Sequence, residues 1–249
     1  YKGRPVGGIG HIGCFSLQGQ KAVSGGEAGV AATHDPELLD RMLLPGHFGR
    51  ITHGEGSRTF DHLGDMGLGT KYRAHPFAIA MALETLRILP KLNAGRTRCY
   101  AIFNDALRAI DGVEVIDPRE DTQRGGYLEF KFKVARAVAD RCDMDLLEKA
   151  FQAEGAPITR DRYSTTNFTY GLIHRSPLFT TFDRRSLGGC FYDPVTYPGP
   201  PVEPPSLPVT EDVCTRLFGC YAFVDVEEAF LLQMAGAVRK VMANLGRLR

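Results

Sequence analysis

The sequence predicts an α/β protein in two parts, with strands and helices around a glycine-rich turn followed by a smaller α+β unit. Three observations support this prediction. Short apolar runs at residues 12–17 and 28–33 flank the turn and are typical of strands. Residues 76–94 repeat apolar side chains at helical spacing. Residues 127–134 alternate apolar and charged side chains, as a half-buried strand does.

The first part contains two predicted helices after its strands. Asp35 is placed to cap a short helix whose first residue is a proline. A long helix is expected over residues 76–94, and the chain changes character around Gly95. We therefore expect two domains, residues 1–95 and residues 96–249.

The second part mixes helices with short strands. We expect, in order, a helix over residues 98–110, a strand over 113–116, the alternating strand over 127–134, a helix over 143–153 and a helix over 210–218. Residues 156–205 show little regular pattern and are rich in proline. The last helix is expected to begin at Asp225 as its cap, with Glu228 as the capping-box partner.

Composition excludes several classes of function. The 249 residues include 30 basic and 29 acidic side chains, a formal net charge of +1, so there is no electrostatic footprint for nucleic acid or for an anionic membrane. No apolar stretch approaches the roughly 18 residues of a spanning helix. The six cysteines form no CxxC pair and the histidines are scattered, so we expect no metal site and a cytoplasmic protein with reduced thiols.

The turn between the first two predicted strands carries a lysine. Ser16 ends the first strand, Lys21 follows five residues later, and Gly25-Gly26-Glu27 comes next. A lysine held in a turn at the end of a strand can form a Schiff base with pyridoxal phosphate, and a nearby serine can hold the phosphate of that cofactor. A solvated surface lysine would fit the same local sequence, so the wider context has to decide.

That context is a resemblance to the DegT/DnrJ/StrS family of pyridoxal-phosphate-dependent sugar aminotransferases. Gly25-Gly26-Glu27-Ala28-Gly29 resembles the family's G-E-G-G turn, and Gly69-Thr70-Lys71-Tyr72-Arg73 resembles its G-Y-N-Y-R segment. Further matching segments lie, in family order, at residues 7–16, 16–21, 147–158 and 207–209. Because the matches span nearly all of the chain, the resemblance is specific although each piece is weak.

The resemblance implies the C-terminal portion of a fold-type I enzyme. The remainder of a large, mostly parallel-sheet domain would be followed by a smaller C-terminal α+β domain. Members of the family work as homodimers in which the neighbouring subunit completes each active site. They use pyridoxal 5'-phosphate to move an amino group from glutamate or glutamine to a keto-sugar or keto-cyclitol in sugar and natural-product biosynthesis.

The resemblance also assigns roles to individual residues. Lys21 would form the internal aldimine and then move a proton as general base and acid. Ser16 would donate its hydroxyl to the cofactor phosphate, or only cap the strand end. Gln18 would approach the cofactor or serve only in the turn. Lys71 replaces the family's asparagine, and it either holds the phosphate of the partner subunit's cofactor as a point charge or is merely exposed. His75 would act in acid–base chemistry or only cap and pack at a helix start.

Two hypotheses follow for the whole protein. The chain begins at Tyr1, and we expect it to be the later portion of an aminotransferase whose N-terminal part is a separate chain or lies outside this sequence. The family's phosphate-binding Gly-Thr and the aspartate that pairs with the pyridine nitrogen would lie there, so we expect this segment alone to be inactive. The alternative is a non-catalytic homologue or subunit that acts as a dimerisation or regulatory partner. Retention of Lys21 argues against that alternative.

Overall fold

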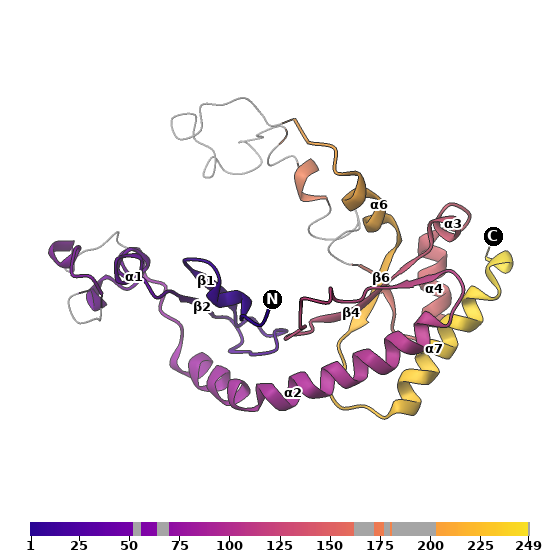
Figure 1. Cartoon of the computed structure of the whole chain (residues 1–249), viewed down its shortest axis with the longest axis horizontal. Helices are drawn as coiled ribbons and strands as arrows, with labels where there is room; N and C mark the ends of the chain where they lie inside the picture. The colour runs from indigo at the N-terminus through magenta and orange to yellow at the C-terminus, as the bar shows by residue number, and fades with distance from the viewer. Residues whose placement is uncertain (52–55, 64–69, 162–171, 177–179, 181–202, 249) are drawn as a thin grey trace. The chain divides into compact units, whose positions relative to one another are not determined.

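The computed structural model describes residues 1–51, 56–63, 70–161, 172–176, 180 and 203–248 (Figure 1). The chain divides into two compact units. The first unit comprises Tyr1–Arg98, Asp117–Leu128 and Ala222–Asp225, and the second comprises Cys99–Ile116, Glu129–Tyr221 and Val226–Arg249. Short 3-10 helices lie at Val6–Gly8, Phe48–Arg50, Asp61–Leu63, Ile173–Arg175 and Leu245–Arg247.

The first unit begins with a hairpin. Strands β1 (Gly13–Ser16) and β2 (Gly29–Ala32) pair antiparallel, with Cys14 opposite Ala31. Helix α1 (Pro36–Leu43) follows, and the side chain of Asp35 accepts hydrogen bonds from the backbone N–H groups of Glu37 and Leu38. Both strands and the Asp35 cap confirm the sequence predictions.

Helix α2 (Pro76–Arg108) corrects the prediction of a break near Gly95, because the helix runs unbroken through that residue. The glycine meets another requirement. A Cβ atom at position 95 would lie 2.1 Å from the backbone oxygen of Val224, so Gly95 allows a second segment to cross the helix closely. Pro90 also lies inside the helix, where its ring removes one backbone donor.

The second unit is built on a four-stranded sheet in the order β3-β4-β6-β5. Its strands are β3 (Val113–Val115), β4 (Glu129–Val134), β5 (Thr159–Arg160) and β6 (Leu217–Tyr221), and its helices are α3 (Arg136–Ala139), α4 (Met144–Ala153), α6 (Pro208–Arg216) and α7 (Glu228–Met242). Every strand pair among the described residues is antiparallel.

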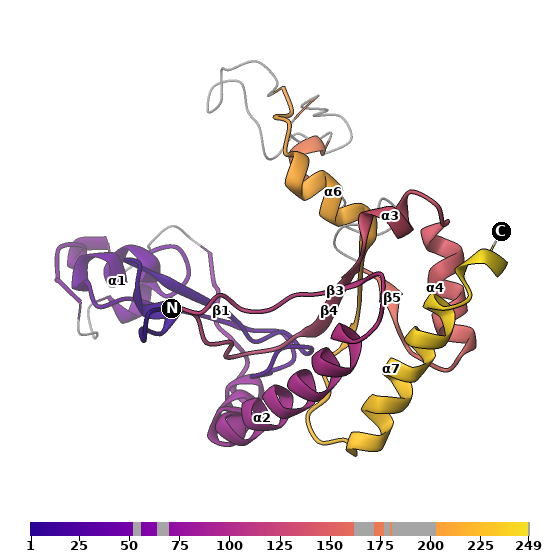
Figure 2. The same cartoon turned by 45° about the vertical axis from the view of Figure 1, so that its right-hand side comes forward.

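Aromatic side chains fill the core of the second unit. Phe130, Phe132 and Val134 point from β4 to the buried side of the sheet, as the alternating sequence predicts. The ring of Phe132 stacks on that of Phe218 with centroids 6.0 Å apart, and Phe151 meets Phe218 edge to face at 5.5 Å. Helices α4 and α7 lie side by side in both views (Figures 1 and 2).

Two further predictions in the second part of the chain are wrong. The predicted helix over residues 210–218 ends at Arg216, and Phe218 lies in β6, where its backbone pairs with Phe132 of β4. Asp225 does not cap the last helix, which begins at Glu228 with Glu227 as its uncapped N-cap residue. The Asp225 carboxylate instead lies 3.7 Å from the Arg98 guanidinium.

The described part of the chain carries neither a candidate membrane span nor a candidate metal cluster. Within it, no helix combines the length and apolarity needed to cross a membrane. The same residues include no group of three or more His, Cys, Asp or Glu side chains that could hold a metal ion.

Candidate active site

The predicted lysine turn is the connection between β1 and β2. It is folded back on itself, because the N–H of Leu17 donates to Ala28 O at 3.0 Å and the N–H of Gly25 donates to Leu17 O at 2.8 Å. Leu17 is buried at the base of this loop. The lysine loop, residues 17–28, is thus an ordered connection anchored at both of its ends.

Glycine lets this loop press against the start of α2. A Cβ atom at position 25 would lie 2.5 Å from the backbone oxygen of Ala78, closer than real Cβ contacts come. Gly26 has φ +80°, the left-handed region that favours glycine. The two glycines therefore allow both the turn itself and its close approach to the helix.

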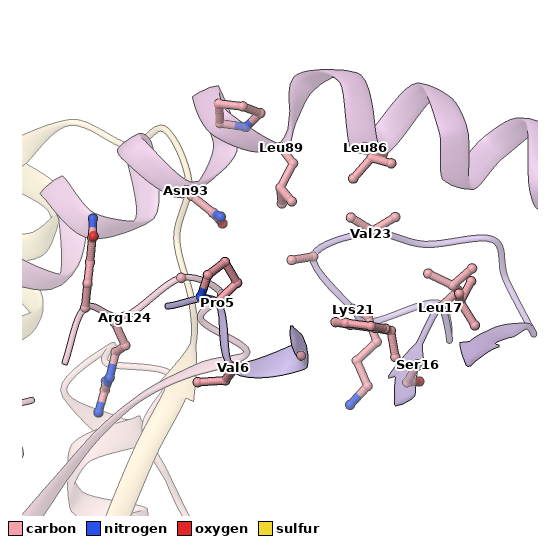
Figure 3. A pocket seen from close by; sticks show the side chains of 18 of the residues that line it. Pro5, Val6, Ser16, Leu17, Lys21, Val23, Leu86, Leu89, Asn93 and Arg124 are labelled. Carbon is pink, nitrogen blue, oxygen red and sulfur yellow. The ribbon is translucent and has the colours of Figure 1, made fainter. Parts of the chain in front are cut away.

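A cavity of about 1580 Å³ opens between the lysine loop and α2 within the first unit (Figure 3). Its lining is mostly apolar, and Figure 3 shows Leu86 and Leu89 reaching from α2 toward the loop that carries Val23 and Lys21. The volume exceeds the roughly 300–1,000 Å³ of ordinary small-molecule pockets. The polar side chains that line it include Ser16, Lys21, Asn93 and Arg124.

Ser16 and Lys21 are brought together on the wall of this cavity. The Ser16 hydroxyl oxygen accepts a hydrogen bond from the Gln18 N–H at 3.3 Å, which leaves its own proton available for donation. The Lys21 side chain is half-buried, and among the described residues it has no hydrogen-bond or ion-pair partner. A primary amine that can attack a carbonyl and a hydroxyl that can donate to an oxyanion therefore share one apolar wall.

This donor set fits the two ends of pyridoxal phosphate. The amine of Lys21 is the nucleophile that its aldehyde requires, and the hydroxyl of Ser16 is a donor suited to its phosphate. The apolar walls from α2 would shield the aromatic ring from water.

Gln18 lies in the same loop but outside the lining of the cavity. Its side-chain oxygen accepts from the Gln20 N–H at 3.0 Å, and its backbone oxygen accepts from the Lys21 N–H at 2.8 Å. The side chain thus closes the turn that presents Lys21. This geometry favours the turn role that the sequence left open for Gln18.

Lys71 and His75 also lie outside that lining. Lys71 is exposed in residues 70–75, which have no regular secondary structure and lead into α2. The Nδ1 atom of His75 accepts from the Phe77 N–H at 3.2 Å, and the two rings pack with centroids 5.0 Å apart. His75 therefore caps and packs at the helix start, the simpler of its two predicted roles.

Two features of the first unit are not among the sequence predictions. Arg124 lines the cavity and lies 5.6 Å from the centroid of the Tyr127 ring. Gly46 and His47 contact the backbone of Tyr72, next to Lys71. Arg124 precedes a pair of glycines, a turn signal that could have marked it. Nothing local in the sequence indicated the contact with Tyr72.

Comparison with known proteins identifies relatives over the whole chain. A putative L-glutamine:3-amino-2,3-dideoxy-scyllo-inosose aminotransferase of Micromonospora echinospora is 28% identical over 100% of this chain and 57% of its own length. An L-glutamine:2-deoxy-scyllo-inosose aminotransferase of Streptoalloteichus tenebrarius is 27% identical, again over 100% of this chain and 57% of the relative. The chain thus spans little more than half the length of these curated relatives.

Solved structures show the same fold. The crystal structure of an aminotransferase from Psychrobacter cryohalolentis matches 99% of this chain and 59% of its own, with a TM-score of 0.71 and 21% identity. The 3-amino-5-hydroxybenzoic acid synthase structure matches 98% of this chain and 57% of its own, with a TM-score of 0.66 and 19% identity. These matches confirm the predicted fold-type I class.

The family model confirms the resemblance drawn from the sequence motifs. The model of the DegT/DnrJ/EryC1/StrS aminotransferase family matches residues 1–184, which include the lysine loop, the segment with Lys71 and all of α2 and β4. The chain belongs to the DegT/DnrJ/EryC1/StrS aminotransferase family.

Proposed function

We propose that this chain provides the lysine side of the active site in an aminotransferase that moves an amino group from glutamine to a keto-cyclitol. The observation that carries the proposal is the placement of Lys21 and Ser16 on one cavity wall. The names of the curated relatives support the choice of glutamine as donor and of a scyllo-inosose-type ketone as acceptor.

The family is one of pyridoxal-phosphate-dependent aminotransferases. In this chain Lys21 would hold the cofactor by a covalent bond between Nζ and the aldehyde carbon, and Ser16 would hold its phosphate. When bound, the cofactor supplies a conjugated ring that accepts electron density from the substrate carbon.

The chain's own residues then perform acid–base chemistry. The Lys21 amine, once freed by the amino donor, takes the proton from the α-carbon of glutamine as general base. In the second half of the reaction it returns a proton to the carbon that was the ketone of the acceptor. The net change is balanced, because the amine-bearing carbon of glutamine becomes a ketone while the ketone of the acceptor becomes a primary amine.

Residues 1–95 would form the cofactor-binding domain and residues 96–249 the small domain of this enzyme. We further propose a homodimer with shared active sites, which is supported by the exposure of Lys71 and its place outside the cavity lining. Catalysis would require more polypeptide than these 249 residues. The exposed apolar side chains of α2, among them Phe77, Met81 and Leu86, support that requirement.

The test uses the native assembly, meaning this chain with any polypeptide that co-purifies with it. The unchanged assembly should show the visible absorption of bound pyridoxal phosphate and should transfer nitrogen from glutamine to scyllo-inosose or its 2-deoxy analogue. Lys21→Ala should abolish the absorption and lower turnover by on the order of 10²–10⁴-fold, the usual contribution of a positioned acid–base group. Lys91→Ala, at an exposed lysine on α2, is the matched control and should change neither.

Three outcomes would contradict the proposal in different ways. Visible absorption that persists in the Lys21→Ala assembly would remove Lys21 from the cofactor site. Faster turnover of a nucleotide-linked keto-sugar than of the keto-cyclitols would show that the acceptor is a keto-sugar and not a keto-cyclitol. An assembly with neither cofactor nor amino transfer would support the alternative of a non-catalytic partner.

A further inference from the structure

Tyr72 is held by backbone contacts on both sides, next to the exposed Lys71. Its N–H donates to the carbonyl of Gly46 at 3.2 Å, and its own carbonyl oxygen lies 3.0 Å from Nε2 of His47. A carbonyl oxygen can only accept, so this His47 nitrogen carries the proton. We call these two hydrogen bonds the Tyr72 contacts.

The Tyr72 contacts fix the backbone that carries Lys71. The peptide unit between Lys71 and Tyr72 contains the N–H that Gly46 accepts, and the next peptide unit contains the carbonyl that His47 binds. Because each peptide unit is planar, fixing these two successive units fixes the backbone at the Tyr72 Cα where they meet, and with it the position of the Lys71 Cα at the outer corner of the first unit. The Lys71 side chain is exposed beside this fixed backbone.

Gly46 is needed for the same geometry. A Cβ atom there would lie 2.5 Å from Cδ2 of the Tyr72 ring and 2.8 Å from its Cβ. Any side chain at position 46 would therefore push the ring away and lengthen the Tyr72 contacts. The backbone N–H groups of Gly46 and His47 both donate to Leu43 O, which ties the contacts to the end of α1.

The same framework extends to the hairpin that bears Lys21. The N–H of Asp35, which caps α1, donates to the hydroxyl of Thr33, and that hydroxyl donates to the backbone oxygen of His11 beside β1. Downstream of Lys71, the start of α2 touches the lysine loop at Gly25. The segment with Lys71 is thus connected to the hairpin twice, through α1 before it and through the start of α2 after it.

We propose that His47 is a positioning residue that orders Lys71 for contact with the phosphate of the pyridoxal 5'-phosphate bound in the partner subunit, an inference that rests on the proposed function. A lysine side chain loses much rotational freedom when it binds a phosphate, so a fixed backbone reduces the entropy that binding costs. His47 touches neither substrate nor cofactor. It acts through the carbonyl of Tyr72.

The test compares two ligands of the apo native assembly, pyridoxal 5'-phosphate and pyridoxal, which lacks the phosphate. His47→Ala should weaken binding of pyridoxal 5'-phosphate by about 3- to 10-fold, the usual value of one hydrogen bond, and should leave binding of pyridoxal unchanged. His47→Gln keeps an N–H donor at a similar reach and should restore most of the affinity. His34→Ala, at an exposed histidine without a hydrogen bond among the described residues, should change neither ligand.

A double-mutant cycle with Lys71→Ala tests the route of the effect. The double variant should bind pyridoxal 5'-phosphate no more weakly than Lys71→Ala alone, because His47 acts only through Lys71. Additive losses, or equal losses for the two ligands in His47→Ala with wild-type circular dichroism, would overturn the inference and leave the proposed function intact. Failure of the unchanged assembly to bind either ligand would refute both.

Discussion

The two units of this chain differ in how far they bury their apolar side chains. In the second unit, Phe132 of β4 and Phe151 of α4 are both fully buried. In the first unit, the apolar side of α2 stays open, with Phe77 75% exposed and Met81 56% exposed. The second unit closes its own hydrophobic core, whereas the first presents much of its apolar surface to solvent.

The difference indicates different tasks for the two units. Leu83 and Leu86 are exposed on α2 and also line the cavity that contains Lys21. Contiguous exposed apolar surface marks sites of binding or assembly more often than it marks scaffold. The first unit is therefore the part suited to hold other molecules, and the second unit is suited to be a stable support.

The largest expected difference between the units comes from replacing one phenylalanine in each of them by alanine. Phe132→Ala removes a fully buried ring that packs on Phe151 and Phe218, and it should cost ~3–5 kcal/mol of unfolding free energy in the second unit. Hydrogen exchange of the amides in β4 and β6 measures that loss locally. Phe77→Ala, the matched change in α2, should alter protection by less than about 0.5 kcal/mol, as exposed positions usually do. Equal losses at the two sites would mean that the core is not confined to the second unit.

Replacing one glycine in each of two helices should change the stability less, and the two changes should have opposite signs. Gly95→Ala in α2 would place a Cβ atom 2.1 Å from Val224 O, so either the crossing segment or the helix must shift. We expect a loss of about 1–3 kcal/mol, typical of overpacking. Gly236→Ala in α7 meets nothing within 4 Å and should gain up to about 1 kcal/mol from helix propensity. Thermal unfolding followed by circular dichroism reports both variants, and stabilisation by Gly95→Ala would show that the crossing at Val224 does not constrain α2.

The comparison also explains which elements the sequence could predict. The alternation in residues 127–134 identified β4 because one side of that strand is buried and the other carries charges. Asp35 identified the start of α1 because its cap is a local hydrogen bond. The error at Gly95 arose because a glycine required by a close tertiary approach looks the same in sequence as a helix breaker. Phe218 was placed in a helix because only its pairing with the distant β4 makes it a strand residue.

The residues around the candidate site also differ in how far apart in the sequence their contacts lie. Ser16 and Lys21 share one hairpin connection, so their spacing in the sequence predicted that they would lie near one another. His47 and Tyr72 are 25 residues apart, and their contact depends on how the chain returns after α1. The sequence motif could therefore point to Lys21 and Ser16, but no local pattern could point to His47.

Charged side chains extend the contrast between the units. In the second unit Arg216 joins three elements, because its guanidinium donates to Glu114 of β3 at 2.8 Å, to Asp212 of α6 at 2.8 Å and to the carbonyl of Val134 at 2.9 Å. The Arg41–Glu37 pair of the first unit lies one turn apart on a single helix and is exposed. Such exposed pairs contribute little to stability.

Acid should therefore weaken the second unit in particular. The hydrogen bond from Arg216 lowers the pKa of Glu114 below its ordinary value of 4.5, although burial opposes that shift. A carboxyl group with a lowered folded-state pKa stabilises the fold above its unfolded pKa, and that stabilisation is lost as the pH falls through the folded value. The protection of β3 and β4 amides should fall as the pH drops below about 4.5. Arg216→Met should weaken that dependence, because the largest cause of the lowered pKa of Glu114 would be lost while Lys133 still pairs with the carboxylate at 3.1 Å, whereas Arg41→Met should leave it unchanged. If Arg41→Met weakened it equally, the acid response would come from exposed surface pairs and the ionic contrast between the units would be lost.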